Sequence, residues 1–271
     1  MDPAGLLLST ALLADAPSDD PVPATDTAFR LEAAIDLWFP RLEGQFTDAG
    51  TEVDVRATDL HDSEQAPAGA LTLIRDRVRI ELRGFSFATE GRMPVEEDFT
   101  LGGVGFEVGD TIDSGFSWWS AGAEVSFDIV ERHRKAANAT DFSLFVLGAL
   151  DVQSVTRDLA DIGTGEVARA REGFLVALVG GGVRLRFDTR PSFPIFRAAE
   201  IAAKGAVGIS VPFGDGEFGG ATRIEAMVTG WFDDHTAIYL GYRLVGASLT
   251  GDELEMTTSL QGLRVGFRHE F

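Results

Sequence analysis

The sequence contains no cysteine. This absence excludes disulfide bonds, thiolate metal ligands and a thiol nucleophile. No run of 18 apolar residues occurs either, so we expect no transmembrane helix. Lys and Arg number only 23 against 43 Asp and Glu, a formal net charge of -20. That deficit argues against nucleic acid as a partner, because phosphate binding needs basic patches. The apolar share of 45% still suffices for a large core or for a surface that faces lipid.

The N-terminal 27 residues differ from the rest of the chain. The apolar run from Gly5 to Leu13, followed by Ala14-Asp15-Ala16, is typical of the hydrophobic region and cleavage site of a signal peptide. The basic residues that usually precede such a run are missing, and a short disordered lead is the alternative. Residues 17–27 read as a Pro-rich acidic linker. We therefore divide the chain into a signal-like segment with a linker, 1–27, and one domain, 28–271.

Alternation with a period of two residues runs through the whole domain, which indicates β-strands. The pattern predicts ten strands near residues 29–46, 69–75, 77–91, 112–131, 142–157, 173–188, 196–213, 219–232, 236–250 and 254–271. The count becomes twelve if residues 100–109 add a hairpin to the wall, and eight if the short second strand fails. An even count is required for a barrel whose two termini lie on the same side of a membrane.

The lengths of strands and connections indicate the fold class. The strands run about ten residues or more, enough for a tilted strand to cross a bilayer. The connections at 75–77 and 233–236 are tight, whereas we expect long loops at 47–69, 92–112 and 157–172. The sequence thus predicts an all-β protein, a closed antiparallel up-and-down transmembrane barrel with its apolar face toward lipid. A soluble lipocalin-like carrier, with the apolar face inward, is the alternative.

The opposite face of the strands carries cations and anions in equal number, although the whole chain is acidic. Enclosed charges need partners, so this balance favours a narrow lumen. The predicted luminal residues are Arg79, Glu81, Arg83, Glu124, Asp128, Asp151, Arg184, Arg186, Glu200, Lys204, Arg223, Glu225, Arg243, Arg264 and Arg268, together with Glu32, Asp36 and Glu270.

This charged lumen allows two interpretations. The charges could fill the barrel as a closed network, or small residues could leave a water path for ions or small solutes. The small residues in question are Gly180, Gly182, Ala202, Ala206 and Gly208.

The last strand resembles the assembly signal of bacterial outer-membrane β-barrels, an alternating apolar strand that ends in Phe. Leu263, Val265, Phe267 and Phe271 match that pattern, and His269 departs from it. Residues 28–271 are similar in layout to the small outer-membrane β-barrel proteins of Gram-negative bacteria. The resemblance implies a monomer in the outer membrane, in contact with lipid and lipopolysaccharide, which the barrel assembly machinery recognises through its C-terminal strand. It leaves the role open, because the group includes porins, anchors, adhesins and lipid-modifying enzymes.

Motifs of catalysis are not evident. The four histidines are scattered, and no metalloprotease, nucleophile-elbow or phosphate-loop pattern occurs. We expect no enzyme activity, no cofactor and no metal site. A His269–Ser pair acting on lipid stays open as an alternative. The acidic segment 47–65 matches no EF-hand spacing and reads as a solvated loop rather than a Ca²⁺ site.

Overall fold

The computed structural model describes residues 29–48, 51–96, 98–101, 104–132, 140–189, 195–251 and 254–271. The segment 1–27, predicted as a signal and linker, lies outside these residues and stays a prediction. Within the part that the structure describes, no helix is long and apolar enough to cross a membrane.

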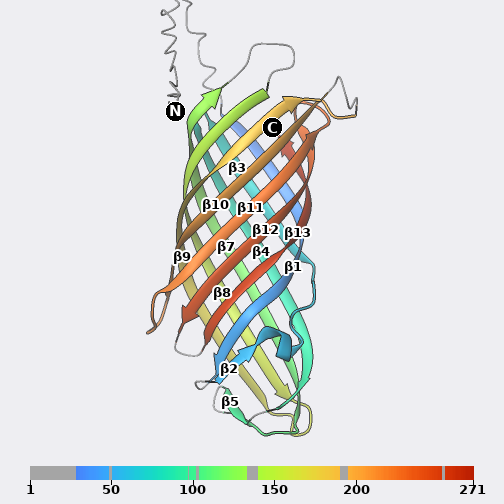
Figure 1. The fold of residues 1–271 in the computed structure, drawn as a ribbon, viewed down its shortest axis with the longest axis vertical. Helices are drawn as coiled ribbons and strands as arrows, with labels where there is room; N and C mark the ends of the chain where they lie inside the picture. The colour runs from blue at the N-terminus through green and yellow to red at the C-terminus, as the bar shows by residue number, and fades with distance from the viewer. Residues whose placement is uncertain are drawn as a thin grey trace, which may run out of the picture.

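The wall of the molecule is a closed antiparallel sheet (Figure 1). Consecutive wall strands are neighbours throughout, and β13 pairs with β1 to close the ring. The predicted count of ten and the predicted barrel class are confirmed. The wall strands are β1 (Arg30–Asp48), β3 (Ala66–Arg75), β4 (Val78–Pro94), β7 (Thr111–Arg132), β8 (Thr140–Asp161), β9 (Val167–Asp188), β10 (Ala198–Pro212), β11 (Gly219–Trp231), β12 (Thr236–Thr250) and β13 (Glu255–Glu270).

Short elements gather at one end of the barrel. The strand β2 (Thr51–Asp54) pairs with the end of β1 and leads into the 3-10 helix η1 (Val55–Thr58). The strands β5 (Phe99–Leu101) and β6 (Val104–Phe106) form a separate two-stranded sheet. Residues near 100–109 therefore do form a hairpin, but outside the wall, so the count stays at ten. We call this end the loop end and the opposite one, where β1 begins and β13 finishes, the terminal end.

Tight turns join strands at the terminal end. Asp76 has a positive φ of 51°, which permits the two-residue turn between β3 and β4. In the β11–β12 turn, the Asp233 carboxylate accepts hydrogen bonds from the backbone N–H of His235 at 2.7 Å and of Thr236 at 2.6 Å. These bonds hold the pKa of Asp233 below its usual range, the bond from His235 most strongly. Short local bonds of this kind fix the turn without a hydrophobic core.

The apolar rows of the strands face outward. Leu263, Val265 and Phe267 of β13 are 57%, 45% and 42% exposed, and Ile35 of β1 and Leu150 of β8 are equally open. Luminal side chains of the same strands, such as Arg264, are buried. The predicted direction of the two faces in this half of the barrel is therefore the observed one.

Toward the loop end the two faces exchange polarity. On β8 the outward row is apolar from Phe142 to Val152 and then continues as Ser154, Thr156 and Asp158. At the same level the inward row carries Val155 and Leu159 at 0% exposure, with the equally buried Arg157 between them. Eleven residues of a strand tilted by about 45° span roughly 25 Å, the height of the apolar band of an outer-membrane barrel.

This exchange overturns the loop predicted at 157–172. β8 continues to Asp161 and β9 begins at Val167, so only a short turn remains between them. β8 and β9 continue through this segment because polar and apolar residues still alternate there. What changes is which face of the strands is apolar. The adjacent prediction of a loop over 92–112 was also too long, since β4 extends to Pro94 and β7 starts at Thr111.

A substitution at Gly262 tests how tightly β1 and β13 pack where they close the barrel. A Cβ atom there would lie 2.9 Å from Pro40 Cα, against backbone that cannot move without breaking the seam. We expect Gly262→Val to lower the free energy of unfolding by about 1–3 kcal/mol through overpacking. Thermal unfolding followed by the heat-modifiable gel shift measures this.

Gly205→Val is the matched control, because a Cβ at that strand glycine meets nothing within 4 Å. Its stability should change by no more than about 0.5 kcal/mol. Equal stability of the two variants would show that the seam tolerates a side chain at Gly262.

Candidate functional site: the charged lumen

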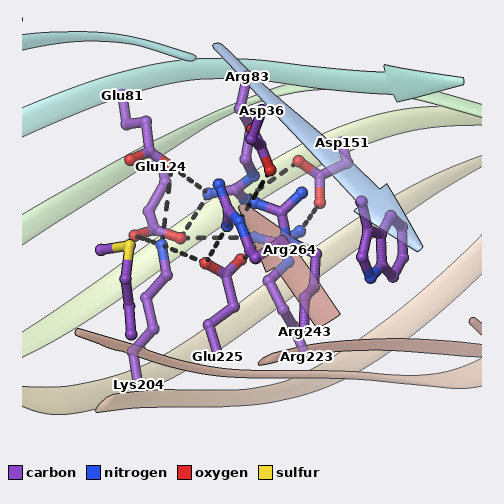
Figure 2. Close-up of polar contacts among 12 residues, drawn as sticks. Asp36, Glu81, Arg83, Glu124, Asp151, Lys204, Arg223, Glu225, Arg243 and Arg264 are labelled. Atoms are coloured by element: carbon purple, nitrogen blue, oxygen red, sulfur yellow. Dashed lines mark hydrogen bonds and ion pairs between the residues drawn. The ribbon is translucent and has the colours of Figure 1, made fainter. Parts of the chain in front are cut away.

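Charged side chains meet across the middle of the barrel in what we call the central network (Figure 2). They project inward from β1, β4, β7, β8 and β10 to β13, so the network bridges opposite walls. It contains cations and anions in equal number: Asp36, Glu81, Arg83, Glu124, Asp151, Lys204, Arg223, Glu225, Arg243 and Arg264.

Glu124 on β7 is one centre of the network. Its carboxylate lies 2.5 Å from Arg83, 2.9 Å from Lys204 and 3.4 Å from Arg223. Asp151 on β8 pairs with the same two arginines, at 3.2 Å from Arg83 and in contact with Arg223. The Asp151 side chain is only 1% exposed. Two carboxylates therefore share two guanidinium groups in a site that water hardly reaches.

Glu225 on β11 is the second centre. It lies 3.2 Å from Arg243 and 3.1 Å from Arg264, and Lys204 at 3.9 Å connects it to Glu124. Arg264 also reaches Asp36 at 2.8 Å and donates a hydrogen bond to the Tyr239 hydroxyl at 3.2 Å. Each buried charge thus has several partners, the condition under which desolvated ions are tolerated.

The other predicted luminal charges lie nearer the terminal end and do not join this network through close contacts. Arg184 is 3.8 Å from Asp128, and Arg268 is 3.9 Å from Glu32 and 3.8 Å from Glu200. The residues of this looser group are Glu32, Arg79, Asp128, Arg184, Arg186, Glu200 and Arg268. Glu270, also predicted inside, pairs with the half-exposed Arg30 at 3.5 Å.

The loop-end half of the lumen is mainly an aromatic and aliphatic core, which the sequence prediction missed, and the buried Arg157 stacks on Phe46 within it. Trp38, Phe46, Phe116, Trp118 and Phe174 are at most 2% exposed and belong to one core cluster. The sequence did indicate apolar residues inside the lumen, because Trp38 follows Glu32 and Asp36 on the same face of β1.

The two buried indoles of this apolar half are satisfied. Trp118 Nε1 donates to Gln153 Oε1 at 2.8 Å, and Trp38 Nε1 donates to Gly262 O at 3.3 Å. Buried tryptophans with bonded N–H groups pack like ordinary core. The layer therefore fills the barrel beyond the central network rather than lining a hollow.

Cavities lie on the terminal side of the network. One of about 100 Å³ is roofed by Glu81, Glu124 and Glu225 and adjoins a second of about 230 Å³. Together they form what we call the terminal cavity. At the boundary with the apolar half, a cavity of only about 10 Å³ remains, about the smallest that holds one water.

Gly180 and Gly182, two of the small residues proposed to leave a water path, are packed, whereas Ala202 lines the cavity of about 100 Å³. A Cβ at Gly182 would lie 2.5 Å from Phe145 Cζ and 2.9 Å from Lys204 Cβ. At Gly180 it would lie 2.6 Å from Ala206 Cα. Neighbouring atoms occupy the space that the missing side chains leave.

The lipid-enzyme alternative depends on the surroundings of His269. His269 lies at the terminal end, with its ring 4.8 Å from that of Phe271 and its Nδ1 3.5 Å from Thr236 Oγ1 rather than from a serine. Among the residues that the structure describes, no group of three or more acidic or histidine side chains could hold a metal ion.

The closed antiparallel wall, the apolar exterior and the charged lumen together decide the architecture. The fold is that of an outer-membrane β-barrel. Solved structures similar to it include the outer-membrane protease OmpT from Escherichia coli, at 9% identity and TM-score 0.44 over 93% of this chain and 99% of that one. The attachment invasion locus protein Ail of Yersinia pestis has 12% identity and TM-score 0.37 over 89% and 99%.

The toluene transporter TodX of Pseudomonas putida is a further similar structure, at 10% identity and TM-score 0.28 over 92% of this chain and 91% of that one. No family model matches the sequence. No curated protein is similar to it by sequence. At these identities and scores the likeness carries nothing about activity, which has to come from the lumen and the surface.

Glu225→Gln tests the central network. The change keeps the shape but leaves Arg243 and Arg264 without their shared anion. Because removing one partner of a buried ion group strands the other, we expect the free energy of unfolding to fall by about 3–5 kcal/mol. Urea unfolding in lipid vesicles, followed by tryptophan fluorescence, measures this.

Glu43→Gln is the control for the surface. Glu43 pairs with Arg56 at 3.0 Å, but the arginine side chain is 67% exposed. An exposed pair contributes about 0–1 kcal/mol. A similar cost for both changes would contradict the special role of the central network.

Proposed function

We propose that this chain is an outer-membrane β-barrel with a closed lumen and a structural or interaction role, rather than a channel. The observation that carries the proposal is the filling of the lumen by two successive layers. The central network bridges the walls at mid-height, and the apolar cluster around Trp38 and Trp118 fills the half beyond it.

The exterior supports membrane insertion. In the closed sheet every wall strand has a hydrogen-bonded neighbour on both sides, as a bilayer requires, because lipid offers no hydrogen bonds. The outward rows are apolar over a band of roughly 25 Å. A soluble lipocalin-like carrier would bury such rows inside the barrel. Here Val179, Leu240 and Leu263 are all more than half exposed, so outer-membrane lipid is the partner that covers them.

The lengths of the connections at the two ends indicate how the barrel is oriented in the outer membrane. Short turns occur on the periplasmic side of outer-membrane barrels and longer loops outside. We therefore place the terminal end in the periplasm and the loop end, with η1 and β5–β6, outside the cell. Beyond the band, the outer wall carries exposed ion pairs such as Arg92–Asp113 at 2.7 Å and Arg56–Glu43 at 3.0 Å. This hydrated collar is the part of the molecule that lipopolysaccharide sugars and external partners meet.

Assembly is expected to proceed through the last strand. Leu263, Val265, Phe267 and Phe271 face outward beside the closing seam. We propose that the barrel assembly machinery recognises this row and that the folded barrel is a monomer.

The cysteine-free sequence allows a direct test of topology. Single cysteines replace Arg169 on the outer wall, Asp76 in a terminal turn and Leu150 in the apolar band. A membrane-impermeant maleimide on intact cells should label only Arg169→Cys. Permeabilising the outer membrane should add Asp76→Cys, while Leu150→Cys stays unlabelled until the protein is denatured. Labelling of Leu150→Cys in intact membranes would contradict insertion, and exchanged labelling of the other two would reverse the orientation.

Conductance in planar bilayers tests the closed lumen. We expect no steady channel from the wild type, and none from Glu124→Ala/Arg223→Ala, because the apolar layer still blocks the path. Only removal of both layers, by adding Trp38→Ala and Trp118→Ala, should open the barrel. Steady ion current from the wild type that changes selectivity in Glu225→Gln would instead establish the narrow-porin alternative.

A further inference from the structure

The terminal cavity differs from the central network in how its cations are paired. Four arginines outside the central network line it: Arg79 on β4, Arg184 and Arg186 on β9, and Arg268 on β13. The carboxylates of Glu32, Asp128 and Glu200 lie among them, in addition to those of Glu81, Glu124 and Glu225 at the roof and of Glu131 and Asp141 at the rim. In the central network most pairs lie within direct hydrogen-bond distance. Here the ion pairs of Arg184 and Arg268 are 3.8–3.9 Å long.

These long pairs leave hydrogen-bond capacity unused. A guanidinium group presents five N–H donors, and direct N–H···O bonds are about 2.7–3.2 Å long. Asp128 accepts its short bond from the Ser143 hydroxyl at 2.6 Å instead. Arg186 lies over the face of Trp231, with its guanidinium carbon 4.8 Å from the ring centroid. The arginines are therefore held in place by charge and stacking while their donors remain available.

Two further donors in this cavity have no acceptor among the described residues. Arg79 Nε is buried without a hydrogen-bond partner, and so is the indole Nε1 of Trp231, whose side chain is only 1% exposed. Both residues line the larger pocket. A buried N–H without an acceptor is costly, in contrast to the satisfied indoles of Trp38 and Trp118. The cavity thus holds two buried N–H donors that an added acceptor could satisfy.

The cavity is also reachable and large enough for a ligand. Its rim carries the half-exposed Arg30, together with Glu131 and Asp141. The larger pocket offers about 230 Å³, well beyond the roughly 10–15 Å³ that one water requires. A ligand would enter from the terminal end, because the central network and the apolar half close the other direction.

We propose that the terminal cavity binds a small oxyanion, with a phosphate group as the chemical class that fits it. Arginines approach from β4, β9 and β13, so an acceptor with oxygens on several sides can meet them, whereas a planar carboxylate has only two oxygens. Guanidinium groups bind phosphate through paired N–H donors. The phosphate comes either from a free phosphate or phosphomonoester or from a lipid headgroup at the membrane edge. This binding role goes beyond the closed-barrel function proposed above.

Calorimetric titration of the folded full chain in neutral detergent with inorganic phosphate tests the site. We expect saturable binding near one equivalent, competed by sulfate. Arg79→Gln and Trp231→Phe should each weaken binding by about tenfold, the loss expected for one hydrogen bond to a charged group. Trp231→Phe keeps an aromatic ring at this position and removes the N–H donor. The heat-modifiable gel shift verifies that each variant is folded.

Arg75→Gln is the matched control. Arg75 lies at the same end but outside the cavity, with its side chain 52% exposed. Phosphate affinity should stay within about twofold, since an exposed charge contributes little. Equal weakening by Arg75→Gln and Arg79→Gln would overturn the proposal, because it would indicate general attraction to surface charge.

Lipid nanodiscs distinguish the two sources of phosphate. Binding of added inorganic phosphate in neutral and anionic bilayers alike supports a soluble ligand. Loss of that binding only in phosphatidylglycerol bilayers supports a headgroup that already occupies the cavity. Absence of saturable phosphate binding in detergent and in neutral bilayers, with folded protein, would overturn the site.

Discussion

The pairing of β13 with β1 is the constraint on which the rest of this structure depends. It runs without interruption from Glu32–Glu270 to Thr47–Glu255, so neither strand has a free edge along this seam. An open edge would expose unpaired N–H and C=O groups, which lipid cannot satisfy. Closure of the barrel also determines whether each wall residue faces the exterior or the lumen. Ile35 and Phe267 meet on the outside of the seam, while Asp36 and Arg264 form an ion pair one residue further along, inside it. A slip of one residue would place those charges in lipid.

The barrel then passes through two environments along its axis, and its side chains follow them. In the terminal half the exterior is apolar and the interior charged; in the loop-end half the exterior is polar and the interior is a packed aromatic core. On β8 the outward row changes from apolar at Val152 to polar at Ser154, and this marks the level where the surroundings of the wall change from lipid to water. The loop-end half resembles an ordinary soluble barrel built directly on a membrane-spanning one. The burial of apolar side chains therefore stabilises the filled lumen in this half.

The charged side chains inside the barrel are arranged so that cations and anions lie close to one another. The chain carries a formal charge of -20, yet the central network is neutral, because an unpaired ion in a narrow interior would face a large desolvation cost. Short contacts join Glu124, Asp151 and Glu225 to their arginines. Nearer the terminal end the pairs lengthen and donors on Arg79 and Trp231 remain unused. The closely paired central network and the terminal cavity, which we propose as a binding site, thus lie at different levels of the same lumen.

The sequence by itself determined the strand count, the approximate strand positions and the direction of the apolar faces in the terminal half. These follow from alternation, a local property that needs no partner to be recognised. It also identified the charges that lie inside. It did not determine which of them meet: Arg83 and Asp151 are 68 residues apart, and only the stagger of the closed sheet sets them at one level while leaving Arg79 and Arg186 below. Nor did it foresee the apolar half of the lumen. Alternation is unchanged when the two faces exchange polarity, so the packing of Trp38 on β1 against Phe85 on β4 was decided only by the tertiary structure.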